Sequence, residues 1–207
     1  GPELVFHGKD YDETLAYMSE QKREPDHHFV HDGGCIEINA GTATIGLEIA
    51  EQLPDADVVI VPVGGGALVG GLGCALKDRT KGVELIGVQA ERSPSMYYSF
   101  MAGRVVDSAL CDTFASGIAV RDALPQALSL VQEVVDRMLL VSENEMKRAM
   151  RTFCDTTGHL AEGAAVAALA GALKIRDQLA GRKVCLLITG ANIDRTLRDE
   201  ILQETAE

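Results

Sequence analysis

The chain of 207 residues contains no tryptophan, and aromatic residues make up only 4% of it. Few aromatics beside abundant Ala, Gly, Val and Leu favour helices packed closely on a sheet over a β-sandwich. No apolar run of about 18 residues or more is present, so we expect no membrane-spanning helix. We also expect neither a signal nor a transit peptide. The chain has 19 basic residues and 31 acidic residues, and its formal net charge is −12. This charge argues against nucleic acid and anionic membranes as partners.

The chain has five cysteines, and no two of them are close together in the sequence. There is no CxxC motif and no Cys/His cluster at zinc spacing. An odd number without a pairing framework predicts a reducing compartment, so we expect the chain to be cytoplasmic. Cys74 and Cys185 fall in predicted core segments, and we expect both to be buried as small apolar side chains.

The most informative stretch is residues 58–73, VVIVPVGGGALVGGLG. A β-branched run ends in Gly64, Gly65 and Gly66 and continues into small residues with helical potential. This pattern predicts a strand, a tight turn and the start of a helix. Such a turn directs backbone N–H groups and the positive end of a helix at one place, where a phosphate binds well.

The remainder of the chain alternates predicted strands and helices. A nearly continuous apolar strand is typical of a parallel sheet that is buried on both faces. The sequence therefore predicts an α/β fold with a mostly parallel twisted sheet covered by helices on both faces. We expect strands at residues 3–6, 29–30, 57–63, 83–89, 138–141 and 184–188. We expect helices at residues 10–22, 40–53, 67–80, 94–101, 124–135, 142–156 and 162–179. Ser142 and Glu145 should form a capping box at the start of one of them, and Asp194 should cap a last helix.

Two well-known phosphate motifs do not match this loop. A Walker loop closes its glycine run with Lys-Ser/Thr, which residues 70–72 do not provide. A dinucleotide fingerprint fits Gly64 and Gly66, but its third glycine is replaced by Val69. The motif also needs an acidic residue at the end of the next strand, and this chain has Gln89 at that position.

A tight turn without any ligand is the competing interpretation. Against it, Gly70, Gly71 and Gly73 lie within the predicted helix, where each costs about 1 kcal/mol relative to alanine. Another helix or a ligand must therefore approach that helix closely. In addition, residues 189–192 end the last predicted strand, and ligands of parallel sheets gather beyond the carboxyl ends of the strands.

Five segments in order resemble the fold type II pyridoxal-phosphate enzymes, most of all the threonine dehydratase and serine racemase group. They are VPVGGGALVGG, GVQAE, DTFASG, AEGAAVAAL and LLITGAN. The stretch GTATIGLEI is also similar to a helix of that group. The resemblance implies that residues 35–207 form the large cofactor domain and that residues 1–34 are a remnant of the small domain.

The resemblance also implies a set of residues that bind pyridoxal 5′-phosphate. Two of its parts hold the cofactor at opposite ends: the phosphate loop binds the phosphate, and the hydroxyl of Thr189 hydrogen-bonds the pyridine nitrogen. Glu162 matches an acid near the ring, although a favourable acid at a helix N-terminus explains it equally well. The implied cofactor-binding residues are Gly64, Gly65, Gly66, Ala67, Leu68, Gly117, Glu162 and Thr189.

Two departures from the group's pattern limit what we expect of this chain. Some relatives hold a divalent cation with an acidic pair that is replaced here by Gln89 and Ser95, so we expect no metal. The group's Schiff-base lysine and its substrate-carboxylate loop belong to a segment upstream of the matched motifs. No lysine of this chain stands in such a sequence context. We therefore expect its lysines to lie in solvent on the surface, and we expect no catalytic residue in this chain.

The sequence is therefore interpreted as the C-terminal portion of a threonine/serine dehydratase-like lyase. Its parent reaction is the α,β-elimination of water from a small hydroxy amino acid, which yields a 2-oxo acid and ammonia. We expect the chain to be inactive alone and to associate as a homo-oligomer or with a complementary N-terminal segment. The alternatives are a non-catalytic cofactor-binding or interaction module, and a racemase, β-replacement enzyme or diamino acid lyase of the same fold.

Overall fold

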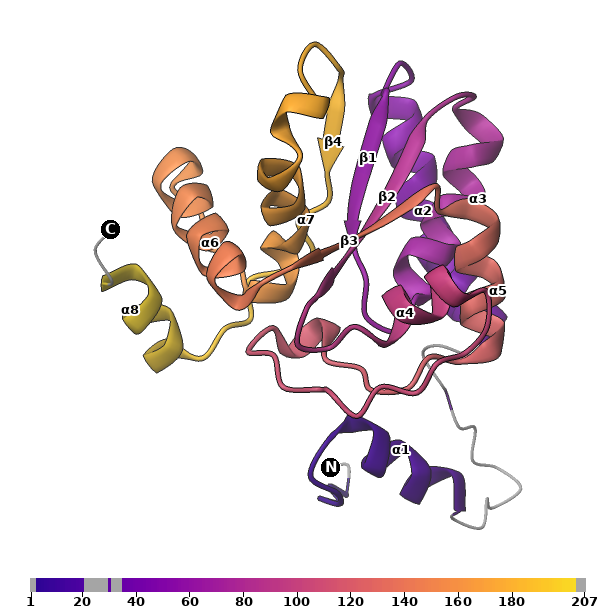
Figure 1. Ribbon diagram of the computed structural model, residues 1–207, viewed down its shortest axis with the longest axis vertical. Coiled ribbons are helices and arrows are strands. Elements are labelled where there is room, and N and C mark those ends of the chain that lie inside the picture. The colour runs from indigo at the N-terminus through magenta and orange to yellow at the C-terminus, as the bar shows by residue number, and fades with distance from the viewer. Residues whose placement is uncertain (1–2, 21–29, 31–34, 204–207) are drawn as a thin grey trace.

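The computed structural model describes residues 3–20, 30 and 35–203. Its centre is a parallel sheet of four strands in the order β3-β2-β1-β4, flanked by helices (Figure 1). The strands are β1 (Val58–Pro62), β2 (Glu84–Ala90), β3 (Arg137–Val141) and β4 (Val184–Leu186). The helices are α1 (Tyr11–Glu20), α2 (Ile36–Gln52), α3 (Ala67–Arg79), α4 (Ser95–Ala102), α5 (Pro125–Val134), α6 (Glu143–Thr157), α7 (Gly163–Lys174) and α8 (Arg195–Gln203).

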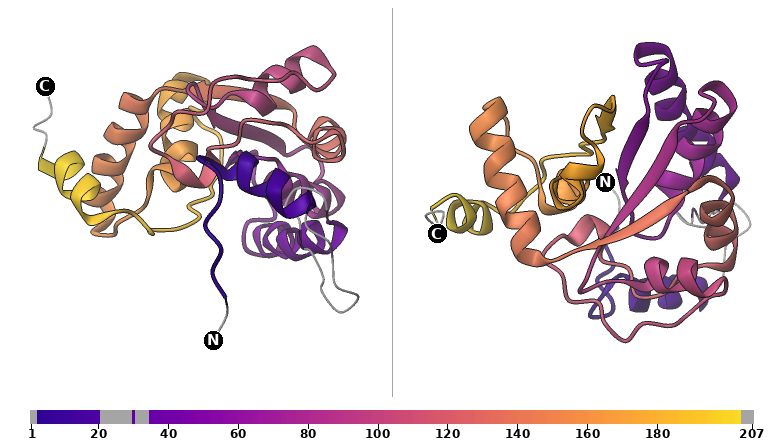
Figure 2. Two further views of the ribbon diagram at one scale, coloured as in Figure 1. Left: turned by 90° about the horizontal axis from the view of Figure 1, so that it is seen from below. Right: turned by 45° about the horizontal axis from the view of Figure 1, so that its top comes forward.

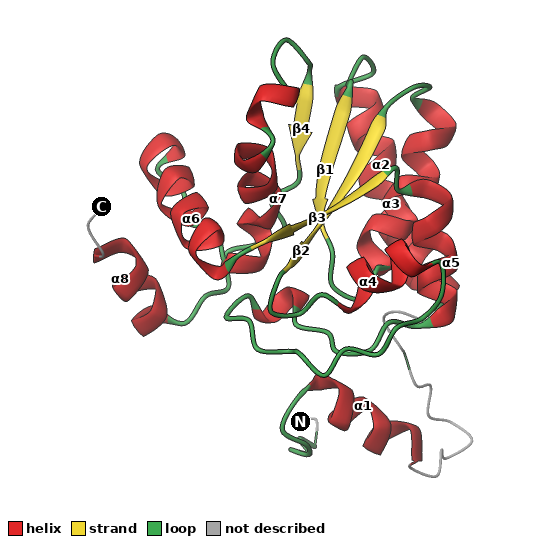
Figure 3. Cartoon of the chain, viewed as in Figure 1, coloured by secondary structure: helices red, strands yellow, loops and turns green. Residues whose placement is uncertain are grey.

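The apolar run of β1 is buried because the two faces of the sheet carry separate cores. Val58 and Ile60 belong to the core that includes α6 and α7, whereas Val59 and Val61 belong to the core that includes α2, α3 and α5. Successive side chains of a strand point to opposite faces, so helices on both sides leave no polar face. Figure 3 shows the strands between these two groups of helices.

Strand order reverses between β1 and β4. The chain starts the sheet at β1, adds β2 and β3 on one side, and then returns to place β4 on the other side of β1. The loops that follow β1 and β4 therefore diverge at the same end of the sheet, which creates a crevice where parallel sheets commonly bind ligands. Helix α1 lies across this end of the molecule (Figure 2).

The glycines inside α3 are explained by neighbouring helices. A Cβ atom on Gly71 would overlap the backbone oxygen of Asn39 in α2, and one on Gly46 of α2 would overlap the backbone oxygen of Leu72. On the other side, a Cβ atom on Gly73 would lie 2.5 Å from a methyl group of Val134 in α5. The expected close approach is therefore made by helices, with backbone against backbone between α2 and α3.

Helix ends follow their sequence signals. Ser142 and Glu145 form a reciprocal capping box at the start of α6, which satisfies two backbone donors there. Asp194 accepts hydrogen bonds from the backbone N–H groups of Thr196 (2.9 Å) and Leu197 (3.1 Å). Both caps were predicted and are confirmed. Among the described helices, none is long and apolar enough to cross a membrane.

Some local expectations are wrong. Residues 3–6 form no strand, because a strand needs a partner and the described sheet consists of β1 to β4. Cys74 is exposed and Cys185 is only partly buried, since Cys74 lies on the solvent side of α3 and β4 is at the sheet edge. The predicted strand at Phe29 and the proposed boundary near Gly33 lie outside the described residues.

Candidate functional site

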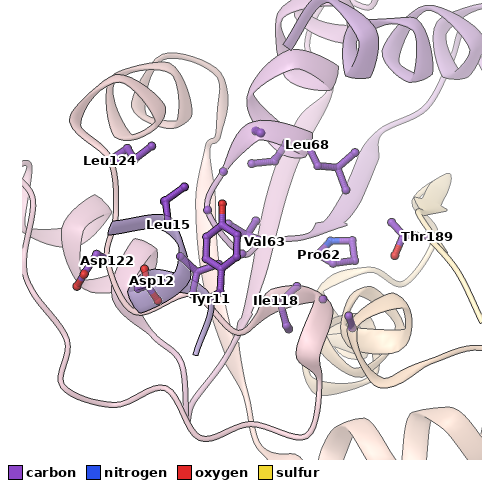
Figure 4. Close-up of a pocket in the computed structure, with 18 of the residues that line it drawn as sticks. Tyr11, Asp12, Leu15, Pro62, Val63, Leu68, Ile118, Asp122, Leu124 and Thr189 are labelled. Atoms are coloured by element: carbon purple, nitrogen blue, oxygen red, sulfur yellow. The ribbon is translucent and has the colours of Figure 1, made fainter. Parts of the chain in front are cut away.

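A cavity of about 590 Å³ lies at the carboxyl end of β1, within the usual size range of small-molecule sites. It is lined by α1, Thr42 of α2, residues 62–69, residues 117–124, the start of α7, and Thr189 after β4. Figure 4 shows Tyr11 and Leu15 of α1 facing Val63, with Thr189 on the far side of Pro62. All the predicted cofactor positions line this one cavity: Gly64, Gly65, Gly66, Ala67, Leu68, Gly117, Glu162 and Thr189.

The glycine loop has the shape of an anion cradle. Gly66 has a φ of 97°, a left-handed conformation that favours glycine, and it precedes the first residue of α3. The first N–H groups of a helix have no helical acceptor, and here no side chain caps them and no acid lies in the first turn. A Cβ atom on Gly65 would meet no atom within 4 Å, so the loop backbone is open to an approaching group.

Gln89 does not line the cavity but contacts its glycine loop, a role that sequence reasoning missed. It is fully buried in β2. Its side-chain amide donates to the backbone oxygen of Gly64 (3.4 Å), and its oxygen accepts from the backbone N–H of Tyr97 (2.8 Å). The sequence did indicate this role, because a glutamine within an apolar strand is buried and its amide needs hydrogen-bond partners. The glutamine connects the glycine loop to α4 and is already engaged in hydrogen bonds.

Replacing Gln89 with leucine should lower the free energy of unfolding by about 1–3 kcal/mol, because two backbone groups lose their partner in the interior. It should also weaken the binding of pyridoxal phosphate, since Gly64 is no longer held. Urea denaturation and cofactor titration measure the two effects. Gln132→Leu on the exposed side of α5 is the control and should change stability by less than about 0.5 kcal/mol. Equal stability of the two variants would contradict the role of Gln89.

Glu162 stands between two loops of the site. It directly precedes α7, and its backbone N–H donates to the oxygen of Gly190 (3.1 Å). A Cβ atom on Gly190 would lie 3.2 Å from its Oε1, and one on Gly117 would lie 3.7 Å from it. The two glycines therefore leave room for this carboxylate. Its place at the start of α7 also suits the helix dipole, so the geometry agrees with both interpretations of this residue.

A second cavity of about 130 Å³ adjoins the first and shares Gly117, Glu162 and Ala164 with it. Asn192 and Asp194 lie on its wall. Acidic side chains are prominent around the larger cavity, which is also lined by Asp12 and Asp122. Partial burial, together with the nearby carboxylate of Asp12, raises the pKa of Asp122. The cavity thus combines a backbone cradle for an anion with carboxylates elsewhere on its wall.

Cationic side chains are placed elsewhere. Among the described residues, no lysine or arginine lines the larger cavity. Lys77 is paired with Asp136 at 2.5 Å, Lys174 with Glu145 at 3.2 Å, and Lys183 with Asp55. The part of the chain that the structure describes also contains no group of three or more His, Cys, Asp or Glu residues arranged to hold a metal ion.

Comparison with known proteins places the chain in one family. The family described as "Pyridoxal-phosphate dependent enzyme" matches residues 1–190. The L-threonine ammonia-lyase of Thermotoga maritima is 37% identical over 204 residues, which cover 99% of this chain and 51% of that protein. The chain spans about half the length of such curated relatives.

Solved structures agree in fold. The processed form of threonine deaminase isoform 2 from Solanum lycopersicum has a TM-score of 0.84 at 27% identity, covering 97% of this chain and 60% of that one. A fungal L-serine ammonia-lyase from Rhizomucor miehei has a TM-score of 0.85 at 25% identity, covering 98% of this chain and 67% of that one. The expected α/β fold is confirmed by these neighbours.

Proposed function

The chain belongs to the family of pyridoxal-phosphate dependent enzymes, and we propose that it forms the cofactor-binding part of a threonine or serine ammonia-lyase. One observation carries the proposal: every residue that the sequence assigns to the cofactor lines the same cavity. That cavity lies at the reversal of strand order, beside an uncapped helix N-terminus. These are the features of a site for a phosphorylated cofactor.

The residues present fit this cofactor. The backbone N–H groups of Gly65, Gly66 and Ala67 would hold its phosphate, with the dipole of α3 favouring the negative charge. The hydroxyl of Thr189 would hydrogen-bond the ring nitrogen, and a neutral hydroxyl leaves that nitrogen largely unprotonated. Pyridoxal phosphate, when bound, acts as an electron sink for an attached amino acid. A weaker sink suits the loss of a β-hydroxyl from a small hydroxy amino acid.

The overall reaction that we propose for the parent enzyme converts threonine or serine into a 2-oxo acid and ammonia. We infer that its catalytic lysine and substrate-carboxylate loop come from outside this chain. The absence of lysine from the described cavity wall supports this inference, and so does the match to only about half of the curated relatives. Cys74, Cys111, Cys154 and Cys185 are free thiols, which supports a reducing compartment such as the cytoplasm.

The purified chain should bind pyridoxal phosphate reversibly and should not produce a 2-oxo acid from L-threonine or L-serine. Without a lysine in the cavity no covalent bond to the cofactor forms there. Borohydride treatment followed by intact mass measurement should therefore leave the cavity unlabelled, and dialysis should remove the bound absorbance. Turnover of either amino acid by the chain alone would refute the assignment of the lysine to another segment.

A non-catalytic binding or interaction module remains the rival function. Several large apolar side chains are exposed, among them Leu4, Val5 and Phe6, and exposed apolar surface favours association with a second copy or a partner. Adding the N-terminal region of a curated relative as a separate chain distinguishes the two functions. Recovery of 2-oxo acid formation supports the lyase fragment, whereas binding without turnover supports the module.

A further inference from the structure

Helix α1 forms one wall of the cavity although it has little packing of its own. Tyr11, Asp12, Leu15, Ala16 and Ser19 all line the cavity from this helix. None of the residues of α1, all of which the structure describes, is buried. Apolar burial, which holds most helices in place, therefore contributes little here. Polar contacts therefore take a larger share in setting the position of α1 over the glycine loop.

That interaction centres on Arg121. Its guanidinium is 2.5 Å from Oδ2 of Asp10, and its backbone N–H donates to Oδ2 of Asp12 at 3.0 Å. The other oxygen of Asp10 accepts the backbone N–H of Glu13 at 2.9 Å and so caps the start of α1. One carboxylate thus fixes both the beginning of the helix and its attachment to the rest of the molecule.

The attachment is partly shielded from water. The side chain of Arg121 is 25% exposed and that of Asp10 is 20% exposed, and charged pairs that are partly buried are screened less than surface pairs. Hydrogen bonds to charged groups are also stronger than neutral ones. Arg121 itself is not part of the cavity lining, so its influence on the cavity passes through α1.

The segment that carries Arg121 is held by hydrogen bonds to two serines. Two buried serines, Ser93 and Ser95, donate from their hydroxyls to the backbone oxygen of Val120, at 2.9 Å and 2.8 Å. The backbone N–H of Val120 donates in turn to Ser93 at 3.0 Å. Hydrogen bonds to two serines that follow β2 therefore hold the backbone next to Arg121, and α1 is attached to that fixed point.

We propose that Arg121 is a positioning residue that holds α1 in place as a wall of the cofactor cavity. This inference deepens the proposed function, because the same cavity would take pyridoxal phosphate. Figure 4 shows the wall that α1 forms: Tyr11 and Asp12 project from α1 at the cavity, and Asp122 lies beside Asp12. Without the ion pair, α1 separates from the segment that carries Arg121, and the cavity opens to water on that side.

Hydrogen exchange of the apo chain tests the attachment without any cofactor. Arg121→Gln keeps the backbone N–H but removes the ion pair, and Asp10→Asn keeps a good helix cap but removes the same pair. Each variant should raise amide exchange across residues 11–20 by about tenfold, as expected for loss of a hydrogen bond to a charged group. Arg121→Lys should restore most of the protection. The double variant should show no more exchange than either single variant, since both remove one interaction.

Arg79→Gln is the control, because Arg79 is paired with its neighbour Asp78 on the exposed side of α3. In the same proteins, titration with pyridoxal phosphate should give a dissociation constant about tenfold higher for Arg121→Gln than for the control. The urea midpoint should stay unchanged, because α1 buries no residue. Additive exchange effects, or exchange equal to that of Arg79→Gln, would overturn the attachment.

Release of α1 without a change in cofactor affinity would overturn its role as a cavity wall. If the unmodified chain binds no pyridoxal phosphate while α1 is still released in Arg121→Gln, the proposed function fails and the attachment by Arg121 is supported. The two inferences therefore fail in distinguishable ways.

Discussion

Gly71→Ala should lower the free energy of unfolding by about 2–4 kcal/mol, the range of severe overpacking in a core. The added methyl group would overlap the backbone oxygen of Asn39 and the hydroxyl of Thr42. That hydroxyl donates to the oxygen of Ala67 at 3.1 Å, so it cannot move aside without losing a bond between α2 and α3. Separation of the two helices would also displace the start of α3 and weaken binding of pyridoxal phosphate.

Gly41→Ala is the matched control for this prediction. Gly41 also lies within a helix, α2, but a Cβ atom there would meet nothing within 4 Å. Alanine is the better helix former, so this variant should gain about 0.5–1 kcal/mol. Urea denaturation monitored by circular dichroism measures both variants. Equal stability of Gly71→Ala and Gly41→Ala would mean that α2 and α3 do not approach as closely as described.

Gly65→Asp should weaken pyridoxal phosphate binding by at least about 100-fold. The position faces open space, so the side chain fits without strain but places a carboxylate beside the expected phosphate. Two like charges about 4 Å apart repel by roughly 4 kcal/mol at an effective dielectric constant of about 20, and every 1.4 kcal/mol changes affinity by about tenfold. Titration by absorbance or fluorescence gives the dissociation constant.

Gly65→Asn separates the effect of charge from that of size. It has nearly the same shape as the aspartate variant and should bind the cofactor more weakly than the original chain but far better than Gly65→Asp. Both variants should keep the original urea midpoint, because neither meets a neighbouring atom at Cβ. Undiminished cofactor binding by Gly65→Asp would remove the glycine loop from the proposed site.

The position of the glycine turn before α3 could be predicted from the sequence because its signals are local. A β-branched run, a glycine turn and a helix start occupy consecutive residues, and each follows from backbone preferences. The same applies to the capping box at Ser142, whose partners are three residues apart. The elements of residues 58–203 were therefore expected close to where they lie, as β1 and α3 show.

Other contributions depend on contacts between distant segments. Gln89 looked like a missing acid in the sequence, but in the fold its amide connects Gly64 to Tyr97. The glycines of α3 looked like possible ligand contacts, but they accommodate α2 and α5. Residues 3–6 have strand-like sequence but form no strand, since β pairing depends on an available neighbour rather than on composition.

The sequence by itself determined the α/β class, the glycine cradle and the residues that resemble a cofactor site, because these depend on periodicity and on short-range backbone geometry. Only the tertiary structure decided that Thr189, Glu162 and Gly117 meet at that cradle. It alone also placed α1 as the opposing wall, attached through Arg121. The physical reason is that a site at the end of a parallel sheet is assembled from loops that are far apart in the chain. Their meeting depends on strand order, which no local preference specifies.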